Sequence, residues 1–310
     1  MFSVVFPGQG SQSVGMGSEL HKNYGYIQDL FSNADDILGF NLSKLILEGP
    51  KENLDLTEFT QPAIFLVSFS IFEVIKKETE IDLLKAKYFA GHSLGEYSAL
   101  ASSGAIKFEH AIKLLQKRGK AMQMSVPKGK GGMIAVLGTE INKIENLLLE
   151  NKNRYKCYIA NDNSVGQIVV SGEIKDLELM SEDLKKDSIK NITLPVSAPF
   201  HCPLMSKATE EMKEEINKTE FYESNCNIIS NVTGTEVKDI SQIKDLLIKQ
   251  IESPVRWRES VLYMKAKGVN KIVEIGPGKV LSGLIKRIDR NLISLSINTN
   301  DEIKNIKLND

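Results

Sequence analysis

The fold is decided by the stretch Tyr88-Phe89-Ala90-Gly91-His92-Ser93-Leu94-Gly95. Its first four residues have the apolar character of a buried strand, and the segment from Leu94 to Ser102 has the composition of a helix. The G-x-S-x-G spacing between them allows a sharp strand-to-helix turn that lifts a serine hydroxyl out of the backbone. The stretch therefore predicts either a nucleophile at Ser93 or an ordinary glycine-lined turn.

Two other segments follow the same order of strand, glycine and helix. Phe2 to Phe6 is a short apolar run that stops at Pro7-Gly8-Gln9-Gly10, and Lys271 to Gly278 leads into the helix-like segment Val280 to Arg287. Three such units predict a mainly parallel sheet with helices on both faces. Ligands bind such sheets at the carboxyl ends of the strands.

The middle of the chain follows a different order. It predicts strands at 133–137, 156–160, 167–171 and 190–195, with helices at 141–150 and 175–187. This β-α-β-β-α-β order is that of a ferredoxin-like unit. The glycine- and lysine-rich segment 127–132 predicts a hinge into the unit, and 197–199 the return. We therefore expect a large α/β core of residues 1–126 and 198–310 and a small inserted subdomain of residues 127–197.

The composition is that of a globular protein with a substantial core, because 42% of the 310 residues are hydrophobic and 25% are charged. Lysine plus arginine (39) nearly equal aspartate plus glutamate (40), so no overall charge attracts nucleic acid or an anionic membrane. The three cysteines favour free thiols and a cytoplasmic location. The longest apolar stretch, Ala63 to Ile75, is shorter than the ~20 residues that span a bilayer, so it predicts a buried helix and no membrane.

A nucleophilic serine needs a base, and histidine suits this task near neutral pH. Of the four histidines, His201 is the best candidate, because it lies between Pro199 and Pro203 where the predicted insert returns to the core. The alternative is a packed histidine in a rigid turn. No acid that would orient His201 can be chosen from the sequence, and a main-chain carbonyl can do the same.

An oxyanion beside Ser93 would need backbone donors. The N–H of Leu94 follows the serine, and the loop Gly8-Gln9-Gly10-Ser11-Gln12 is placed to supply the second donor. An anion-binding turn or a simple tight turn is the alternative for this loop. The loop has no phosphate-binding glycine pattern, which disfavours a nucleotide site.

Seven segments, in order along nearly the whole chain, together resemble the malonyl-CoA:acyl carrier protein transacylases of fatty acid synthesis and the acyltransferase domains of polyketide synthases. They are Phe6-Pro7-Gly8-Gln9-Gly10-Ser11-Gln12, Thr60-Gln61-Pro62-Ala63, Gly91-His92-Ser93-Leu94-Gly95-Glu96-Tyr97, Gln116-Lys117-Arg118-Gly119, Ala160-Asn161-Asp162-Asn163, Pro199-Phe200-His201-Cys202 and Glu274-Ile275-Gly276-Pro277-Gly278. The resemblance implies an α/β-hydrolase-like core with a ferredoxin-like insert and the active site between them.

The resemblance also implies roles for eight residues. Ser93 would attack the donor thioester, and His201 would accept its proton and return it to the leaving thiol. The other six would be the backbone oxyanion donors Gln9 and Leu94 and the substrate-site residues Arg118, Gln250, Asn161 and Phe200.

Within this set, the main-chain carbonyl of Gln250 would orient His201. Arg118 would select a malonyl group over acetyl, because a guanidinium forms a planar fork that matches a carboxylate. The residues alone favour an exposed arginine on the helix Ala111 to Met122 instead. Phe200 resembles the malonyl-selecting form of its motif.

The implied reaction transfers malonyl from malonyl-CoA to acyl carrier protein without a metal or bound cofactor, in a protein we expect to be a monomer. An acidic carrier protein would dock on basic residues, the candidates being Lys117, Lys128, Lys130, Lys279, Lys286 and Arg287. Two other classes stay open: a serine esterase or thioesterase, which would not need Arg118, and a non-catalytic acyl-binding module. Supply of fatty acid rather than polyketide synthesis is favoured by a chain that has no ketosynthase or carrier segment.

Overall fold

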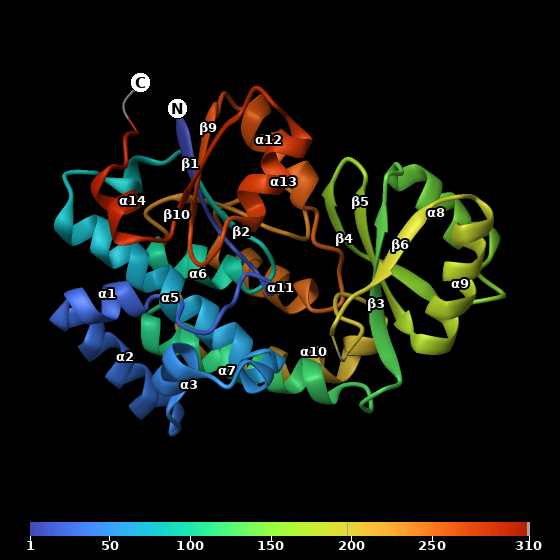
Figure 1. Ribbon diagram of the computed structural model, residues 1–310, viewed down its shortest axis with the longest axis horizontal. Helices are drawn as coiled ribbons and strands as arrows, with labels where there is room; N and C mark the ends of the chain where they lie inside the picture. The colour runs from blue at the N-terminus through green and yellow to red at the C-terminus, as the bar shows by residue number, and fades with distance from the viewer. Residues whose placement is uncertain (197, 309–310) are drawn as a thin grey trace.

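The protein, seen here as a computed structural model, is described for residues 1–196 and 198–308. Ser197, the last residue of the predicted insert, and residues 309–310 lie outside the described residues. Two sheets form the centres of two lobes (Figure 1). The larger sheet has the strands β1 (Phe2–Phe6), β2 (Tyr88–Gly91), β7 (Asn227–Ile229), β8 (Glu236–Val237), β9 (Lys271–Ile275) and β10 (Ile293–Ile297). The smaller sheet has β3 (Gly131–Leu137), β4 (Cys157–Ser164), β5 (Gln167–Glu173) and β6 (Lys190–Thr193).

The larger sheet has the order β10-β9-β1-β2-β7-β8 and is parallel except for β8. Successive residues of β1 alternate between two cores, because side chains along a strand point to opposite faces. Val4 and Phe6 belong to one apolar cluster, and Val5 belongs to the other. The mainly parallel sheet with helices on both faces is therefore confirmed.

The helices around this sheet form the larger lobe. Those packed on the Val4 face include α5, α6 and α7, and those on the Val5 face are α12 and α13. The helices of the larger lobe are α1 (Ser18–Asn23), α2 (Gly25–Leu38), α3 (Leu42–Glu48), α4 (Lys51–Leu54), α5 (Thr57–Glu78), α6 (Gly95–Ser102), α7 (Phe108–Met124), α10 (Ser206–Lys218), α11 (Ile240–Gln250), α12 (Trp257–Ala266), α13 (Val280–Ile288) and α14 (Asn300–Lys304).

Helix α5 is longer than the sequence predicts. It has 22 residues, so by length and composition it is the one helix in the described part of the chain that could cross a membrane, and the expectation that it is too short is wrong. Of its apolar window, 78% is buried inside the protein. The expectation of a buried helix is confirmed, since α5 packs against α7 and the sheet.

The smaller lobe has the predicted β-α-β-β-α-β order, with α8 (Ile141–Glu150) and α9 (Ile174–Lys186) as its helices. Its sheet is antiparallel with the order β4-β5-β3-β6. Gly131 and Gly132, predicted as hinge residues, are the first two residues of β3, because they pair with Glu173 and Gly172 of β5. Gly131 lies so close to Pro199 that a Cβ would come within 2.4 Å of the proline ring.

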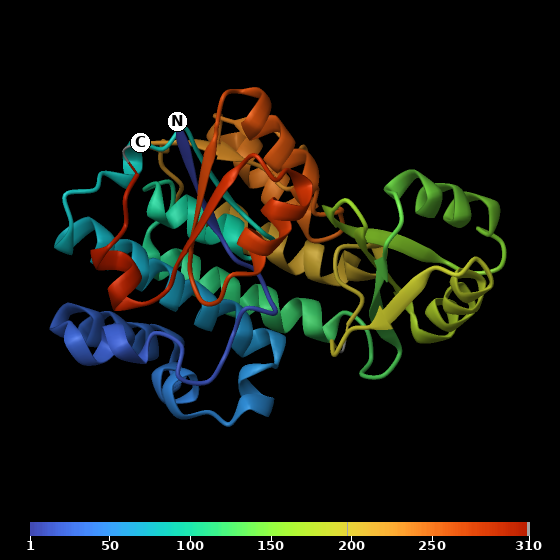
Figure 2. The ribbon, with the colours of Figure 1, turned by 45° about the horizontal axis from the view of Figure 1, so that its top comes forward.

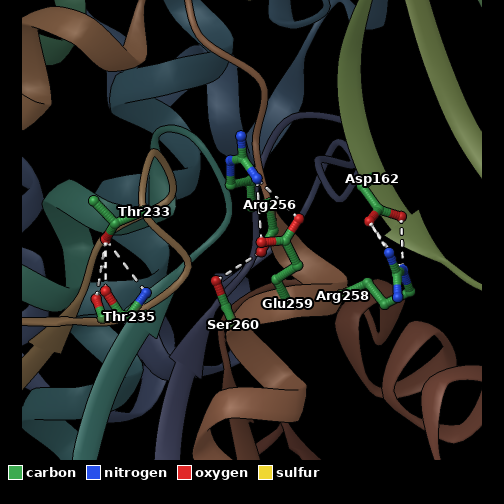
Figure 3. A network of polar contacts seen from close by, with 7 residues as sticks. All are labelled: Asp162, Thr233, Thr235, Arg256, Arg258, Glu259 and Ser260. Atoms are coloured by element: carbon green, nitrogen blue, oxygen red, sulfur yellow. Dashed lines mark hydrogen bonds and ion pairs between the residues drawn. The ribbon is translucent and has the colours of Figure 1, made fainter. Parts of the chain in front are cut away.

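The chain passes from the larger lobe into the smaller one and back (Figure 2). Backbone and side-chain contacts also join the two lobes. Strand β4 extends past its predicted end, and Asn161 forms a parallel β-bridge with Val255 of the larger lobe. The next residue, Asp162, accepts two hydrogen bonds from Nε of Arg258 on α12 and lies 2.7 Å from its Nη2 (Figure 3). This ion pair fixes β4 against α12, with the Asp162 side chain 3% exposed.

Candidate active site

The turn between β2 and α6 is sharp because two glycines pack where no side chain fits. A Cβ on Gly91 would lie 1.9 Å from the carbonyl carbon of Gly95, and one on Gly95 would lie 2.3 Å from the carbonyl oxygen of Phe6. Between them, Ser93 has a φ of 55°, in the left-handed region that side chains rarely adopt. The turn thus presents the Ser93 hydroxyl at the carboxyl end of the strand and the N-terminal end of the helix.

The hydroxyl of Ser93 is bonded to a histidine from a distant part of the chain. Oγ of Ser93 lies 2.8 Å from Nε2 of His201, and Nδ1 of His201 lies 2.8 Å from the main-chain oxygen of Gln250. The carbonyl oxygen can only accept, so Nδ1 carries a proton and donates it, and Nε2 of the neutral ring is left to accept from the serine. The structure therefore brings together the predicted nucleophile, the predicted base and the carbonyl expected to orient that base.

Arg118 lies in the same site and is fully buried. Its Nη1 donates to Oε1 of Gln61 at 2.7 Å, and its Nη2 donates to Oε1 of Gln250 at 2.8 Å and to Oγ of Ser93 at 3.1 Å. The guanidinium also lies over the ring of Tyr97. The exposed position that the residues alone favoured is wrong, because α7 turns this side chain toward the serine. Within the described residues, no carboxylate forms an ion pair with Arg118.

Burial keeps the histidine uncharged. Removal from water, aided by the nearby Arg118 cation, lowers the pKa of His201 from 6.5 to about 3. A histidine with so low a pKa is neutral at pH 7 and free to accept a proton from Ser93. The arrangement of a serine, a neutral imidazole and a buried cation suits the acylation of the serine by an acid derivative that carries a negative group.

A cavity of about 230 Å³ opens beside Ser93 between the lobes. Residues named from the sequence line it, among them Gln9, Leu94, Asn161 and Phe200. In residues 1–196 and 198–308, the main-chain N–H groups of Gln9 and Leu94 have no protein acceptor, so both are available to a ligand. In the same ranges, no group of three or more histidine, cysteine or acidic side chains is placed to hold a metal ion.

Sequence reasoning missed several residues that hold the site. Oδ1 of Asn231 accepts from the Ser93 N–H at 2.7 Å, and its Nδ2 donates to the Gly91 oxygen at 2.7 Å. It lies 138 residues from Ser93, and no local pattern points to it. Gln61 and Glu96 lie within two of the seven segments that resemble the transacylase family. Nothing else in the sequence pointed to a part in the site for either residue.

A hydrogen bond between His92 and Asn163 also supports the serine turn. Nε2 of His92 lies 2.8 Å from Oδ1 of Asn163 on β4, and its ring packs near Trp257. The serine turn is thereby bonded to the smaller lobe as well. This hydrogen bond reaches across the two lobes, from the serine turn to β4.

Comparison with known proteins places nearly the whole chain in the acyltransferase family that the sequence resembles. The model of a family described as acyl transferase domain matches residues 3–299. A Bacillus subtilis (strain 168) protein named malonyl CoA-acyl carrier protein transacylase is 41% identical over 304 residues, which cover 97% of this chain and 94% of the relative.

Solved structures agree in fold. The crystal structure of an acyl-carrier-protein-S-malonyltransferase from Bartonella henselae superposes with a TM-score of 0.95 at 39% identity, covering 98% of this chain and 97% of that one. A malonyl-transacylase solved in complex with a type II polyketide synthase acyl-carrier protein superposes with a TM-score of 0.93 at 36% identity, covering 98% and 97%. The chain therefore belongs to the acyl transferase family and, within it, to the malonyl CoA-acyl carrier protein transacylases.

Proposed function

We propose that this chain transfers a malonyl group from malonyl-CoA to the phosphopantetheine thiol of acyl carrier protein through a malonyl ester of Ser93, and thereby supplies fatty acid chain elongation. The observation that carries this proposal is the position of the Ser93 hydroxyl, which contacts both the His201 imidazole and the Arg118 guanidinium. A serine hydrolase needs the first contact but has no use for the second. The buried cation therefore favours transfer of an acyl group that carries a carboxylate.

In the first half-reaction, His201 accepts the proton of Ser93 Oγ as that oxygen attacks the thioester carbonyl of malonyl-CoA. The N–H groups of Gln9 and Leu94 donate to the oxyanion that forms. When the tetrahedral intermediate collapses, the carbon–sulfur bond breaks and His201 returns the proton to the CoA sulfur. In the second half-reaction the carrier thiol gives its proton to His201 and attacks the ester, and Ser93 regains its hydrogen.

We assign the selection of malonyl to Arg118. Its guanidinium presents a planar fork to the free carboxylate of the acyl group, and its buried Nε has no acceptor among the described residues. An acetyl group would leave the guanidinium fork without a carboxylate to accept its hydrogen bonds. Gln250 would support the site twice, through its carbonyl to His201 and through its side chain to Arg118. Asn161 and Phe200 would form the wall against the acyl and pantetheine parts of the substrate.

The finer description of the fold is also a proposal. The strand order β4-β5-β3-β6 and the antiparallel pairing support a ferredoxin-like subdomain at residues 127–197. The parallel sheet with its serine on a strand-to-helix turn supports an α/β-hydrolase-like core of residues 1–126 and 198–310. We propose further that the protein acts as a monomer in the cytoplasm. We also propose that it works without a bound cofactor, since the chemistry above uses only the protein's own groups.

For the carrier protein, we propose contacts with exposed basic residues, of which Lys279 directly precedes Val280 in the cavity wall. Lys128, Lys130, Lys279 and Lys286 are exposed. Lys117 is paired with Glu215, which offsets its charge, whereas Arg287 donates to the neutral amide of Gln167 and keeps its charge. An acidic carrier domain would be attracted to the exposed lysines.

The test is incubation with malonyl-CoA labelled in the malonyl group. We expect a covalent label on the wild-type protein that moves to added holo acyl carrier protein. Ser93→Ala should form no label. Ser98→Ala is the matched control, because Ser98 is a buried serine on α6, the helix that follows Ser93, and its hydroxyl has no partner among the described residues, so it should label normally.

Each other outcome has a distinct meaning. Release of free malonate without transfer would identify a thioesterase, and absence of any label would identify a binding module. Transfer to a polyketide carrier protein but not to a fatty acid carrier protein would contradict the assignment to fatty acid synthesis.

A further inference from the structure

Glu96 is a buried carboxyl group for which the mechanism above has no use. It follows Gly95 in the first turn of α6, and the residue is 2% exposed. Its Oε2 accepts one hydrogen bond from Nε2 of Gln250 at 2.7 Å and another from the main-chain N–H of Asn231 at 3.1 Å. A carboxyl group removed from water in this way is costly unless it has a purpose or partners.

The first partner, Gln250, connects Glu96 to the catalytic groups. Its Nε2 donates to Glu96 and to the main-chain oxygen of Ser93, and its Oε1 accepts from Arg118. A glutamine amide turned the other way would place its NH₂ against the guanidinium and its oxygen against the carboxylate. Glu96 therefore fixes the orientation in which the amide oxygen faces Arg118, and the main chain of the same residue holds His201.

The second partner, Asn231, connects Glu96 to the serine turn. While its main-chain N–H donates to Glu96, its side chain spans the turn from the Ser93 N–H to the Gly91 oxygen. One carboxyl oxygen thus holds both residues that support the nucleophile and the cation. Hydrogen bonds that share an acceptor in this way couple the positions of the groups they join.

The charges around Glu96 determine whether its carboxyl group is protonated. The charged and titratable groups around it are Arg118 from α7 and Tyr97 from its own helix. Burial raises the pKa of Glu96 to about 7, although the Asn231 and Gln250 hydrogen bonds and the Arg118 cation oppose the shift. A malonyl carboxylate bound to Arg118 would bring a second negative charge to a site with one cation, which favours the protonated form of Glu96.

We propose that Glu96 is a positioning residue that sets the amide of Gln250 and through it Arg118, and that Glu96 takes up a proton when a malonyl carboxylate binds to Arg118. This inference rests on the proposed function and deepens it. It makes the preference for malonyl depend on pH, because protonation of Glu96 removes its repulsion of the substrate carboxylate.

The test compares kcat/KM for malonyl-CoA with kcat/KM for acetyl-CoA between pH 8 and pH 6. Both substrates carry the same CoA, so their ratio isolates the carboxylate. We expect the wild-type ratio to rise roughly five- to tenfold as the pH falls, because one unit of pKa change corresponds to a factor of ten. In Glu96→Gln, which keeps an acceptor oxygen but cannot titrate, the ratio should change by less than about twofold over the same range.

Two further variants complete the experiment. Glu109→Gln, an exposed substitution on α7, should retain the wild-type rise. Glu96→Asp keeps a carboxyl group on a shorter arm, so kcat should fall while the pH dependence of the ratio stays. A folded Glu96→Gln protein with the wild-type rise, or a folded Glu96→Asp protein without it, would overturn the inference. Failure of the wild type to form a malonyl ester would instead overturn the proposed function.

Discussion

The Ser93 hydroxyl has two partners whose chemical effects are complementary. His201 is an uncharged acceptor at 2.8 Å, and Arg118 is a cation at 3.1 Å. The cation stabilises negative charge on the serine oxygen, and it also disfavours a positive charge on the imidazole. Burial and Arg118 together therefore keep the base ready at a pH where an ordinary histidine would be partly protonated.

The pH dependence of serine acylation should reveal this. The pKa of His201 is lowered to about 3, so the base is neutral above that pH and becomes protonated only as the pH falls through it. The substrate is acetyl-CoA, whose acyl group has no carboxylate. Between pH 8 and pH 5 we expect its single-turnover acylation rate to show no titration of a base with a pKa near 6.5. Quenched-flow measurement of the labelled ester checks it. A midpoint near 6.5 would mean that His201 titrates as if exposed.

Substitution of Arg118 should change selectivity more than acylation in general. In Arg118→Ala we expect kcat/KM for malonyl-CoA to fall by about two orders of magnitude, the size of a charge-assisted bidentate contact. Acetyl transfer should improve relative to malonyl transfer. Arg118→Lys keeps the charge without the fork and should be intermediate, whereas the exposed Lys120→Ala on the same helix should behave as wild type. An unchanged malonyl-to-acetyl ratio in Arg118→Ala would remove Arg118 from substrate selection.

At the scale of the element, the turn between β2 and α6 depends on close backbone packing. Gly95 lies against the carbonyl oxygen of Phe6 on the neighbouring strand, and Gly91 lies against Gly95 itself. Only glycine allows this approach, and the approach gives Ser93 its left-handed conformation. The position of the nucleophile is thus a property of the strand, turn and helix together.

Two glycine substitutions on helices separate this packing from helix propensity. Gly95→Ala would place a Cβ 2.3 Å from a carbonyl oxygen, so we expect a loss of more than about 3 kcal/mol in the free energy of unfolding and no labelling of Ser93. Gly283→Ala on α13 meets no atom within 4 Å and should stabilise by about 0.5–1 kcal/mol. Urea unfolding measures both. A Gly95→Ala protein as stable and active as the wild type would contradict the packing described for the turn.

The sequence predicted the elements best where a short apolar strand meets glycine. The strands Phe2–Phe6 and Tyr88–Gly91 were predicted with the bounds they have. Strand β4 was predicted to end at Ala160, yet it continues through the poor strand formers Asn161, Asp162 and Asn163 to Ser164, with pairing to β5 and Val255. Local propensity could not reveal that pairing.

In the candidate site, too, residues with a local sequence pattern could be predicted without the resemblance, and residues lacking one could not. Ser93 and His201 were candidates from the residues alone, because a sharp glycine turn and a proline-flanked histidine are local patterns, with an ordinary turn and a packed histidine as the alternatives. Arg118 came only from the resemblance, since a lone arginine on an amphipathic helix normally faces water. Asn231 was missed, because its part in the site consists of hydrogen bonds to a turn 138 residues earlier in the chain.

At the scale of the whole molecule, the cavity beside Ser93 is lined by residues of both lobes, so contacts between the lobes bear on its shape. Two arginines at the start of α12 differ in their surroundings (Figure 3). Arg258, on α12, pairs across the lobes with Asp162, whose side chain is 3% exposed. Arg256, the residue before α12, pairs with Glu259 of that helix, whose side chain is 39% exposed. Only the first pair joins the lobes, and only the first is shielded from water.

Removal of each arginine should therefore have a different effect. Arg258→Met leaves the buried Asp162 carboxylate uncompensated, so we expect the free energy of unfolding to fall by about 3–5 kcal/mol. KM for malonyl-CoA should rise, because β4 also carries Asn161 at the cavity. Arg256→Met should cost at most about 1 kcal/mol, the usual value of an exposed pair.

The double variant with Asp162→Asn separates loss of the ion pair from loss of packing. Since the asparagine brings no buried charge, Asp162→Asn combined with Arg258→Met should recover most of the stability lost in Arg258→Met alone. Urea unfolding of the three variants and of the wild type supplies the cycle. Equal losses for Arg256→Met and Arg258→Met would mean that the Asp162–Arg258 pair is no stronger than a surface ion pair, and that other contacts, among them the Asn161–Val255 bridge and the His92–Asn163 hydrogen bond, hold the lobes together.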